Sequence, residues 1–381
     1  MRTVSKTVIG VDFGTQSARA VLVNAENGEI IYSCRKEYPY NSTPVPAIDC
    51  AENLPCATDY EMTLYELLRN VIPEEYRKTV AGICVDATSL TMVLLAEDGR
   101  ALSELDGWSE AAHARVKLWK YHRAQEKADE ALNLARNLQE PFLGRTGGSI
   151  SCEWMLPKLL EVRDEAPEIY SKIDLAMDLC EFLTFRLTGQ LVRSIGSLSY
   201  KCLWAEDLSF PERTFLNGLR AGFYEEYCHF LRGDVRKLGE CAGVLRSELT
   251  KRWGLPEQIP VATGMLDGHT SLATMGAFEP GDAALIVGPS NVCTVQDRKL
   301  QELKDVCGVA QDGMVTGSCG IDTGQSSTGN MLGWFVEHMA GWQIHREAEE
   351  RKISPHQVLA ERIQKPWENK VIAVDWWSGS R

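Results

Sequence analysis

Short apolar runs alternate with polar turns at the start of this chain and again in its second half. The first run, Val8 to Val11, is followed by a polar turn over Asp12 to Ser17 and by a second run, Ala20 to Val23. Asn27-Gly28 then gives a tight turn into a third run, Glu29 to Cys34. Runs of this length between turn-forming residues are typical of β-strands. The amino-terminal segment therefore predicts a meander of three strands.

Helical spacing of apolar residues follows this meander. The residues from Leu64 to Val71 recur on one helical face, after a capping box at Thr58-x-x-Glu61 and before Pro73, so we predict a helix there. Similar reasoning predicts further helices over residues 108–135, 153–162 and 178–188, and the last of these ends at Gly189.

The second half of the chain repeats part of this arrangement. A strand over Ala81 to Asp86 follows the first helix, a strand returns at Ile259, and a helix begins near Asp267. Residues 284–295 then form a second hairpin, centred on Gly288. Three strands, a helix and a strand fit the half-domain of the actin, Hsp70 and sugar-kinase superfamily. We expect an α/β fold with two actin-like (ribonuclease H-like) domains and a cleft between them, divided into residues 1–275 and 276–381.

Composition and charge narrow the class of partner. The chain has 381 residues, which suggests two domains, and a net charge of −13 from 53 acidic and 40 basic residues. This charge repels nucleic acids and anionic membranes, so neither is an expected partner. The 12 cysteines include no Cys-x-x-Cys pair, and no apolar run approaches membrane-spanning length. We expect reduced thiols and a cytoplasmic location.

The turn after the first strand has the residues that a phosphate loop needs. Gly14 allows close approach of a ligand to the backbone, Thr15 adds a hydroxyl group, and Asp12 can face a metal ion that accompanies phosphate. Gly and Asp also form ordinary hairpin turns. The recurrence of such a turn at Gly288 favours phosphate binding over the ordinary hairpin.

Ordered sequence blocks carry a more specific resemblance. The chain is similar over essentially its whole length to the FGGY-type carbohydrate kinases, and within that family most similar to the L-ribulokinases. The blocks are Asp12-Phe-Gly-Thr-Gln-Ser-Ala-Arg19, Asp86-Ala-Thr-Ser-Leu-Thr91, Val116-Lys-Leu-Trp-Lys120 with His122, and residues 147–155, 187–193, 322–329 and 375–381.

The resemblance implies transfer of a phosphoryl group from ATP, with Mg²⁺, to a sugar hydroxyl. Asp267, in Thr263-Gly-Met-Leu-Asp-Gly-His-Thr270, matches the base that accepts the hydroxyl proton. Read without the resemblance, this residue equally suits a helix N-cap. The resemblance also implies nucleotide contacts from Asp12, Gly14, Thr15, Gln16, Gly288 and Ser290, with Asp12 at the metal.

The resemblance assigns the sugar contacts to Lys201, Asp322 and Gln325, in addition to Asp267. Ammonium donors and carboxylate acceptors suit the hydroxyl groups of a polyol. Without the family, Lys201 reads as a solvated loop lysine. Ribulokinases carry the longer Glu where this chain has Asp322. The shorter side chain puts in question both its reach to the substrate and the substrate preference.

Five further positions in these blocks could line the sugar pocket. Thr88 and Ser89 either line the sugar pocket or satisfy backbone groups at a strand end. Trp119, on the predicted 108–135 helix, is expected to serve packing, and Lys120 could line the pocket. We expect no catalytic role for His122, because Asp267 already fills the position of the base.

Two features depart from a working kinase. Pro289, where the family usually has Gly-Thr, lacks the N–H that a phosphate loop donates. Residues 371–374 read as a buried strand shortly before the end of the sequence, so we expect the second domain to be truncated.

The most favoured function is ATP-dependent phosphorylation of a ketopentose, L-ribulose, at its terminal hydroxyl. The alternatives are a kinase for D-ribulose, xylulose or glycerol, a catalytically impaired sugar-binding relic or fragment of such a kinase, and a chaperone or filament protein of the same superfamily. The expected partners are a small sugar and ATP, with a homodimer left open.

Overall fold

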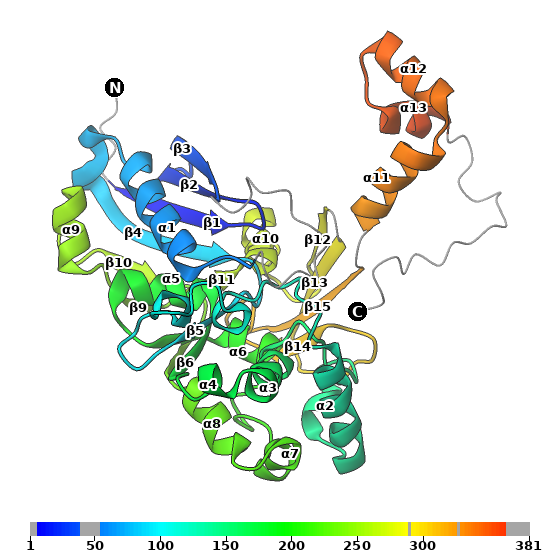
Figure 1. Cartoon of the computed structure of the whole chain (residues 1–381). Helices are drawn as coiled ribbons and strands as arrows, with labels where there is room; N and C mark the ends of the chain where they lie inside the picture. Colours follow the sequence, from blue (N-terminus) through cyan, green and yellow to red (C-terminus); the bar gives the residue numbers. More distant parts are fainter. Residues whose placement is uncertain (1–5, 39–53, 289–290, 326–327, 363–381) are drawn as a thin grey trace.

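The computed structural model describes residues 6–38, 54–288, 291–325 and 328–362 (Figure 1). Two sheets, with helices against them, make up most of this part of the chain. The predictions for Pro289, Ser290 and the strand at 371–374 lie outside the described residues.

The first sheet contains the predicted meander. Strands β1 (Thr7–Phe13), β2 (Ser17–Asn24) and β3 (Ile30–Glu37) are antiparallel neighbours. Strand β4 (Val80–Ala87) runs parallel to β1 and continues the sheet in the order β3-β2-β1-β4-β10-β9, where β10 is Pro260–Ala262 and β9 is Cys241–Val244. The short strand β11 (Met265–Leu266) also pairs with β4. The meander and the strand after the first helix are therefore confirmed.

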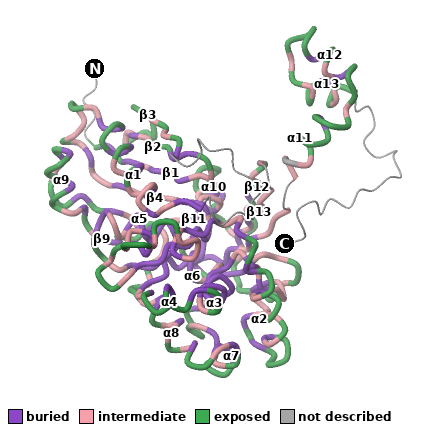
Figure 2. Tube along the Cα trace, viewed as in Figure 1, coloured by how far each residue is buried: buried purple, intermediate pink, exposed green. Residues whose placement is uncertain are grey.

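Helix α1 (Ala57–Val71) packs on this sheet through the apolar face that its spacing predicted. Leu64, Leu67, Leu68 and Val71 are all buried, in a core that they share with α5 (Leu179–Thr188) and α9 (Ser247–Trp253) (Figure 2). The predicted capping box was wrong, because α1 begins before Thr58. The backbone N–H of Cys56 instead donates to Asp59 Oδ2 at 3.1 Å. Helix α5 ends at Gly189, whose φ is +72°, as predicted.

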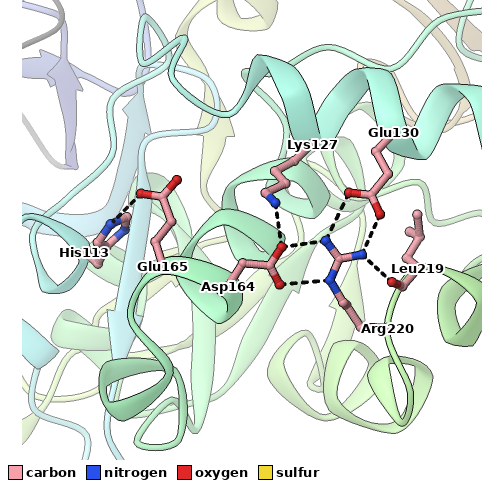
Figure 3. A network of polar contacts seen from close by, with 7 residues as sticks. All are labelled: His113, Lys127, Glu130, Asp164, Glu165, Leu219 and Arg220. Atoms are coloured by element: carbon pink, nitrogen blue, oxygen red, sulfur yellow. Dashed lines mark hydrogen bonds and ion pairs between the residues drawn. The ribbon is translucent and has the colours of Figure 1, made fainter.

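A second helical layer has its own core. It is formed by α2 (Gln125–Leu138), α3 (Met155–Glu165), α4 (Pro167–Tyr170), α7 (Arg213–Leu219) and α8 (Phe223–Phe230). Figure 3 shows how charges join these helices: Arg220 lies between Glu130 of α2 and Asp164 of α3, and its Nε donates to Asp164 Oδ1 at 2.9 Å. Hydrogen bonds from Arg220 lower the pKa of Asp164 to about 2, so this carboxylate stays ionised.

The predicted helix over residues 108–135 was wrong in its first half. Helix α2 begins only at Gln125, and the preceding segment contains turns and a short 3₁₀ helix at Ala112–Ala114. Here the backbone N–H of Lys117 donates to Met92 O of strand β5 (Met92–Leu95), at 3.1 Å. This non-local pairing replaces the i to i−4 hydrogen bonds of a helix.

Shorter elements complete the first part of the chain. Strand β5 pairs with β6 (Leu175–Asp178), and β7 (Val192–Ser194) pairs with β8 (Asp234–Arg236). Helix α6 (Ile195–Lys201) follows β7, and helix α10 (Asp267–Met275) follows β11. Short 3₁₀ helices lie at Glu74–Thr79, Leu102–Glu104 and Pro141–Gly144.

The second sheet contains the predicted second hairpin. Its strand order is β12-β13-β15-β14, with β12 at Ala283–Val287, β13 at Asn291–Asp297, β14 at Gly308–Gln311 and β15 at Cys319–Gln325. All neighbours in this sheet are antiparallel, and β12 and β13 flank Gly288. Helices α11 (Thr328–Met339), α12 (Trp342–Arg351) and α13 (Pro355–Arg362) extend away from this sheet (Figure 1).

Tyr200 of α6 anchors the two sheets to each other. Its side chain is buried, and its hydroxyl donates to Gly320 O of β15 at 2.7 Å. A Cβ atom on Gly313 or Gly320 would lie only 2.6 or 2.5 Å from Tyr200 atoms, so the ring fills a socket that only glycine leaves open. None of the helices in the described ranges combines the length and apolar character required to cross a membrane.

Candidate active site

A cavity of about 270 Å³, here called the central cavity, lies between the strand ends of the first sheet and the second sheet. It brings together six of the predicted site residues: Thr15, Thr88, Ser89, Lys201, Asp267 and Asp322. The other lining residues are Leu90, Trp119, Ser149, Ser151, Glu153, Trp154, Leu266, Gly268, His269, Val292, Cys307, Thr323 and Gly324.

Asp267 is the first residue of α10, with Leu266 in the N-cap position. Its Oδ1 accepts the backbone N–H of Gly268 at 2.7 Å. Burial and the negative charge of Asp12 raise the pKa of Asp267 to about 6, although backbone N–H groups of Gly268 and Ser89 oppose this shift. A carboxylate with this pKa is ionised at neutral pH and is a stronger proton acceptor than an exposed aspartate.

Asp86 is a site residue to which the sequence interpretation gave no role. It lies directly opposite Asp12 in the parallel pairing of β4 with β1. Burial, followed by the charge of Asp12, raises the pKa of Asp86 well above its usual value. Its Oδ1 is buried and has no hydrogen-bond partner among the described residues. The signal in the sequence was an aspartate near the carboxyl end of each of two predicted strands, because parallel neighbours bring such residues together.

The carboxylates of Asp12 and Asp86 are the residues that could hold a Mg²⁺ ion bound together with ATP. Among the described residues no group of three or more His, Cys, Asp or Glu side chains could hold a metal alone. Mg²⁺ in phosphoryl-transfer enzymes is held by one or two carboxylates together with water and substrate phosphates. Two carboxylates fit this pattern. The Asp12 side chain is 39% exposed, and its Oδ2 lies 3.6 Å from Arg19 Nη1. Asp86 Oδ1 has no hydrogen-bond partner among the described residues.

Lys201 and Asp322 form an ion pair on the wall of the cavity. Lys201 Nζ lies 3.4 Å from Asp322 Oδ2, and His269 Nε2 lies 3.8 Å from the same oxygen. Burial alone would raise the pKa of Asp322, but Lys201 and His269 outweigh it and hold the pKa at about 2. The side chain of Lys201 is only 12% exposed, so its interpretation as a solvated loop lysine was wrong. Sequence reasoning missed His269, although it lies two residues after Asp267.

The Thr88-Ser89-Leu90 turn forms another wall, and here the two residues differ. Thr88 lines the cavity, and its hydroxyl is 2.8 Å from that of Thr91, a contact between side chains rather than with a backbone group of the strand end. The Ser89 hydroxyl is buried without a partner among the described residues and lines the cavity. Leu90 has a φ of +47°, a left-handed conformation that costs a residue with a Cβ about 1–2 kcal/mol.

Two buried charged residues hold this strained turn. Asp178 Oδ2 accepts the N–H of Leu90 at 2.9 Å, and Lys158 Nζ donates to Leu90 O at 2.9 Å. Lys158 also donates to Leu118 O at 2.9 Å, next to Trp119, while Asp178 Oδ2 accepts the hydroxyl of Ser197 in α6. Burial lowers the pKa of Lys158 and raises the pKa of Asp178, each to about 7. Lys158 and Asp178 thus link three walls of the central cavity: the Leu90 turn, the segment at Trp119 and helix α6.

Trp119 belongs to the cavity wall, so its interpretation as a packing residue on a helix was wrong. It lies outside α2, and its indole N–H donates to Thr15 Oγ1 at 3.1 Å. His122 Nε2 lies 3.1 Å from Glu153 Oε1, and neither His122 nor Lys120 lines the cavity.

The remaining predicted nucleotide contacts lie beside the central cavity. Gly14 O accepts the hydroxyl of Tyr38 at 2.9 Å, and neither Gly14, Gln16 nor Gly288 lines the cavity. Asn291 and Gln325 are directly opposite each other in β13 and β15. Asn291 Oδ1 and Gln325 Nε2 are both buried without a partner among the described residues, which leaves polar groups free for a ligand.

Comparison with known proteins identifies the family. Residues 7–275 match the FGGY family of carbohydrate kinases, N-terminal domain. The ribulokinase of Halalkalibacterium halodurans is 33% identical over 387 residues, which cover 99% of this chain and 69% of that protein. The ribulokinase of Mycolicibacterium smegmatis is 35% identical over 388 residues, with the same two coverages.

A solved structure confirms the predicted fold. The ligand-bound xylulose kinase from Lactobacillus acidophilus superposes with a TM-score of 0.72 at 17% identity, and covers 93% of this chain and 65% of that one. This chain therefore spans about two thirds of the length of the proteins that it resembles. The predicted α/β, actin-like fold class is confirmed by this likeness. By the match over residues 7–275 and the similarity to ribulokinases along nearly all its length, the chain belongs to the FGGY family of carbohydrate kinases.

Proposed function

We propose that this protein catalyses the ATP-dependent phosphorylation of a ketopentose, L-ribulose, at its terminal hydroxyl. The observation that carries the proposal is the half-buried Asp267, with its pKa of about 6, in the same cavity as the Lys201–Asp322 pair. Removal of a proton from a bound polyol requires a carboxylate with a raised pKa, next to donors and acceptors that hold the polyol in place. The two relatives described above are ribulokinases, which favours ribulose as the acceptor.

In this mechanism the sugar binds in the central cavity. Lys201 donates to sugar oxygens, and Asp322, held ionised by Lys201, accepts hydrogen bonds from hydroxyl groups. Asp267 accepts the proton of the attacking hydroxyl as its oxygen forms the bond to phosphorus. Ser89 and Gln325 are proposed to orient the sugar through their unpartnered polar atoms, and Thr88, which lines the cavity, through its hydroxyl.

ATP with Mg²⁺ supplies the phosphoryl group and neutralises its charge when bound. Asp12 and Asp86 would hold the metal, and Thr15 would contact a phosphate oxygen. We extend the nucleotide site to Gly14, Gln16, Gly288 and Ser290.

We also propose a boundary between an N-terminal domain over residues 1–275 and a C-terminal domain from 276 to 381, supported by the separate sheets on its two sides. A cytoplasmic location is part of the same proposal.

A second candidate function is sugar binding without phosphorylation. Pro289 follows Gly288 in the second turn and has no backbone N–H to donate to a phosphate oxygen. Under this alternative the central cavity would bind a pentulose, but ATP would not react.

A panel of acceptors tests the two candidates. ADP release would be measured with MgATP and L-ribulose, D-ribulose, D-xylulose or glycerol, while sugar binding is measured separately by calorimetry. We expect ADP release with the highest kcat/KM for L-ribulose. Sugar binding without ADP release would favour the second candidate, and absence of both would contradict both.

A further inference from the structure

A second cavity, of about 420 Å³, shares no lining residue with the central cavity. We call it the side cavity; it is lined by Phe142, Arg145, Thr146, Ser199, Leu203, Trp204, Ala205, Glu206, Asp207, Leu300, Val309, Ala310 and Gln311. Helix α6 contributes to both cavities, with Ser199 at the side cavity and Lys201 at the central one. The proposed reaction uses none of the residues of the side cavity.

The side cavity is built where the second helical layer meets the second sheet. Its first wall comes from residues 142–146 and 203–207, and its second wall comes from Leu300 and strand β14. The backbone N–H of Val309 donates to Arg145 O at 2.8 Å, which fixes the two walls to each other. Ligand sites occur preferentially at such interfaces, and the volume lies within the range of about 300–1,000 Å³ that small molecules occupy.

Two polar side chains in this cavity lack adequate partners. Thr146 is only 5% exposed, and its Oγ1 has no hydrogen-bond partner among the described residues. The Arg145 side chain is 15% exposed, and the carboxylate that pairs with it, that of Asp207, is 3.5 Å away and 71% exposed. A buried hydroxyl without a partner and a weakly paired guanidinium both lower stability, so an acceptor group that satisfied both would bind favourably.

Part of the remaining lining is apolar. Phe142 and Leu203 are buried, and Trp204 is partly buried beside them. Aromatic and aliphatic walls suit the body of an organic molecule, while the guanidinium fork matches the oxygens of a carboxylate or a phosphate.

We propose that the side cavity binds a small organic anion, whose carboxylate or phosphate group contacts Arg145 and Thr146 and whose apolar body packs against Phe142 and Trp204. Asp207 must then release Arg145. This release costs little, because a long ion pair with one solvent-exposed partner is weak. Glu206 on the same rim is exposed, so its charge is screened by solvent and salt.

Calorimetric titration of the whole chain tests this site directly and needs no catalytic activity. The probes are phenyl phosphate and benzoate, which separate the two anion types, and neutral benzyl alcohol as the matched control. We expect at least one anion to bind at 1:1 stoichiometry and benzyl alcohol to bind at least tenfold more weakly.

Four variants locate the bound anion. Arg145→Gln should weaken binding at least tenfold and Thr146→Val severalfold, whereas Lys201→Met, in the central cavity, and Arg298→Gln, at an exposed arginine, should leave it unchanged. Thermal melts confirm folding, and Arg145→Lys, which keeps the charge but loses the fork, replaces Arg145→Gln if the latter does not fold. The proposal is overturned if neither anion binds, if benzyl alcohol binds as tightly, or if Lys201→Met rather than the Arg145 and Thr146 variants abolishes binding.

Discussion

At the scale of single residues, two carboxylates in one cavity have opposite electrostatic environments. Burial and the charge of Asp12 raise the pKa of Asp267, whereas Lys201 and His269 hold the pKa of Asp322 near 2 in spite of its burial. One group is therefore suited to accept a proton and the other to remain an anion. Such a separation of pKa values between neighbouring groups is the pattern expected for a proton acceptor and a binding residue.

The raised pKa of Asp267 predicts how activity depends on pH. The base must be ionised, so activity is present above its pKa and is lost as the pH falls through about 6. An ordinary aspartate would lose activity only near pH 4. The dependence of log(kcat/KM) on pH should have a slope of one below about pH 6, in a range where melts show the protein to be folded. A flat profile down to pH 5 would contradict this role.

Asp322 predicts a change in substrate preference. It stands where the resemblance expects Glu, so Asp322→Glu should extend the carboxylate toward the sugar and raise the preference for L-ribulose over D-xylulose. One hydrogen bond to a substrate hydroxyl contributes about 1–2 kcal/mol, so the ratio of kcat/KM values should rise roughly tenfold. Asp322→Asn is the control, since it keeps the length and removes the charge. An unchanged or reversed preference in Asp322→Glu would show that side-chain reach does not set specificity.

At the scale of secondary-structure elements, the turn at Leu90 depends on residues that never enter the cavity. Lys158→Met would remove the donor to Leu90 O and Leu118 O, so two cavity walls would lose a common support. We expect KM for the sugar to rise about tenfold, as for the loss of a charged hydrogen bond of roughly 1.5–3 kcal/mol, with a smaller change in kcat.

The control is Lys117→Met. Lys117 is equally buried, but its ammonium pairs with Glu161 at 3.1 Å and not with the Leu90 turn. This variant should lower the melting temperature and leave KM unchanged. Equal effects of both variants on KM would assign Lys158 a general role in stability rather than a positioning role.

Neighbouring glycines test the contact between the loop at residues 147–148 and the segment before β14. Gly147 has a φ of +65°, and a Cβ there would lie 2.1 Å from Val306 O; Gly148 has a φ of +81° with no atom within 4 Å. Gly148→Ala should cost about 1–2 kcal/mol, from the left-handed conformation alone. Gly147→Ala should cost about 1–3 kcal/mol more, because backbone must move. Equal losses in denaturant unfolding would show that the close approach of Val306 is not needed.

Local patterns predicted some elements well and others poorly. The meander and α1 were predictable because their buried residues follow the periods of a strand and a helix. Residues 108–124 were not, because the backbone of Lys117 pairs with Met92, a contact that local spacing does not encode. Thr58-x-x-Glu61 has the pattern of a capping box, but burial of Ala57 and Tyr60 in the core places the helix start earlier.

Local sequence patterns also failed to identify most residues of the candidate site. Asp267, Lys201 and Asp322 were identified only through the family resemblance, and the structure places them on one cavity. Asp86, His269, Lys158 and Asp178 were missed because their roles depend on neighbours distant in sequence. Parallel pairing of β1 with β4 sets Asp86 against Asp12, and the fold brings Asp178 to the Leu90 turn.

At the scale of the whole molecule, the central cavity exists because two sheets meet at α6. Tyr200 anchors this helix in the glycine socket of the second sheet, and the adjacent Lys201 thereby reaches Asp322 of β15. Asp267, from the first sheet's side, lines the same cavity. The proposed proton acceptor and the proposed sugar-binding pair thus come from different parts of the chain, as expected if an acceptor sugar is positioned against a nucleotide.

The most direct test of this account compares the wild-type chain with Asp267→Asn. The rate of ATP-dependent phosphate transfer to L-ribulose would be followed by ³¹P NMR, and L-ribulose affinity would be measured by calorimetry. We predict a sugar phosphate ester from the wild type, a loss of about 10²–10⁴-fold in rate for Asp267→Asn, and nearly unchanged sugar affinity. The assignment of Asp267 as the base would be contradicted if Asp267→Asn transferred phosphate at the wild-type rate. It would also be contradicted if the variant no longer bound L-ribulose.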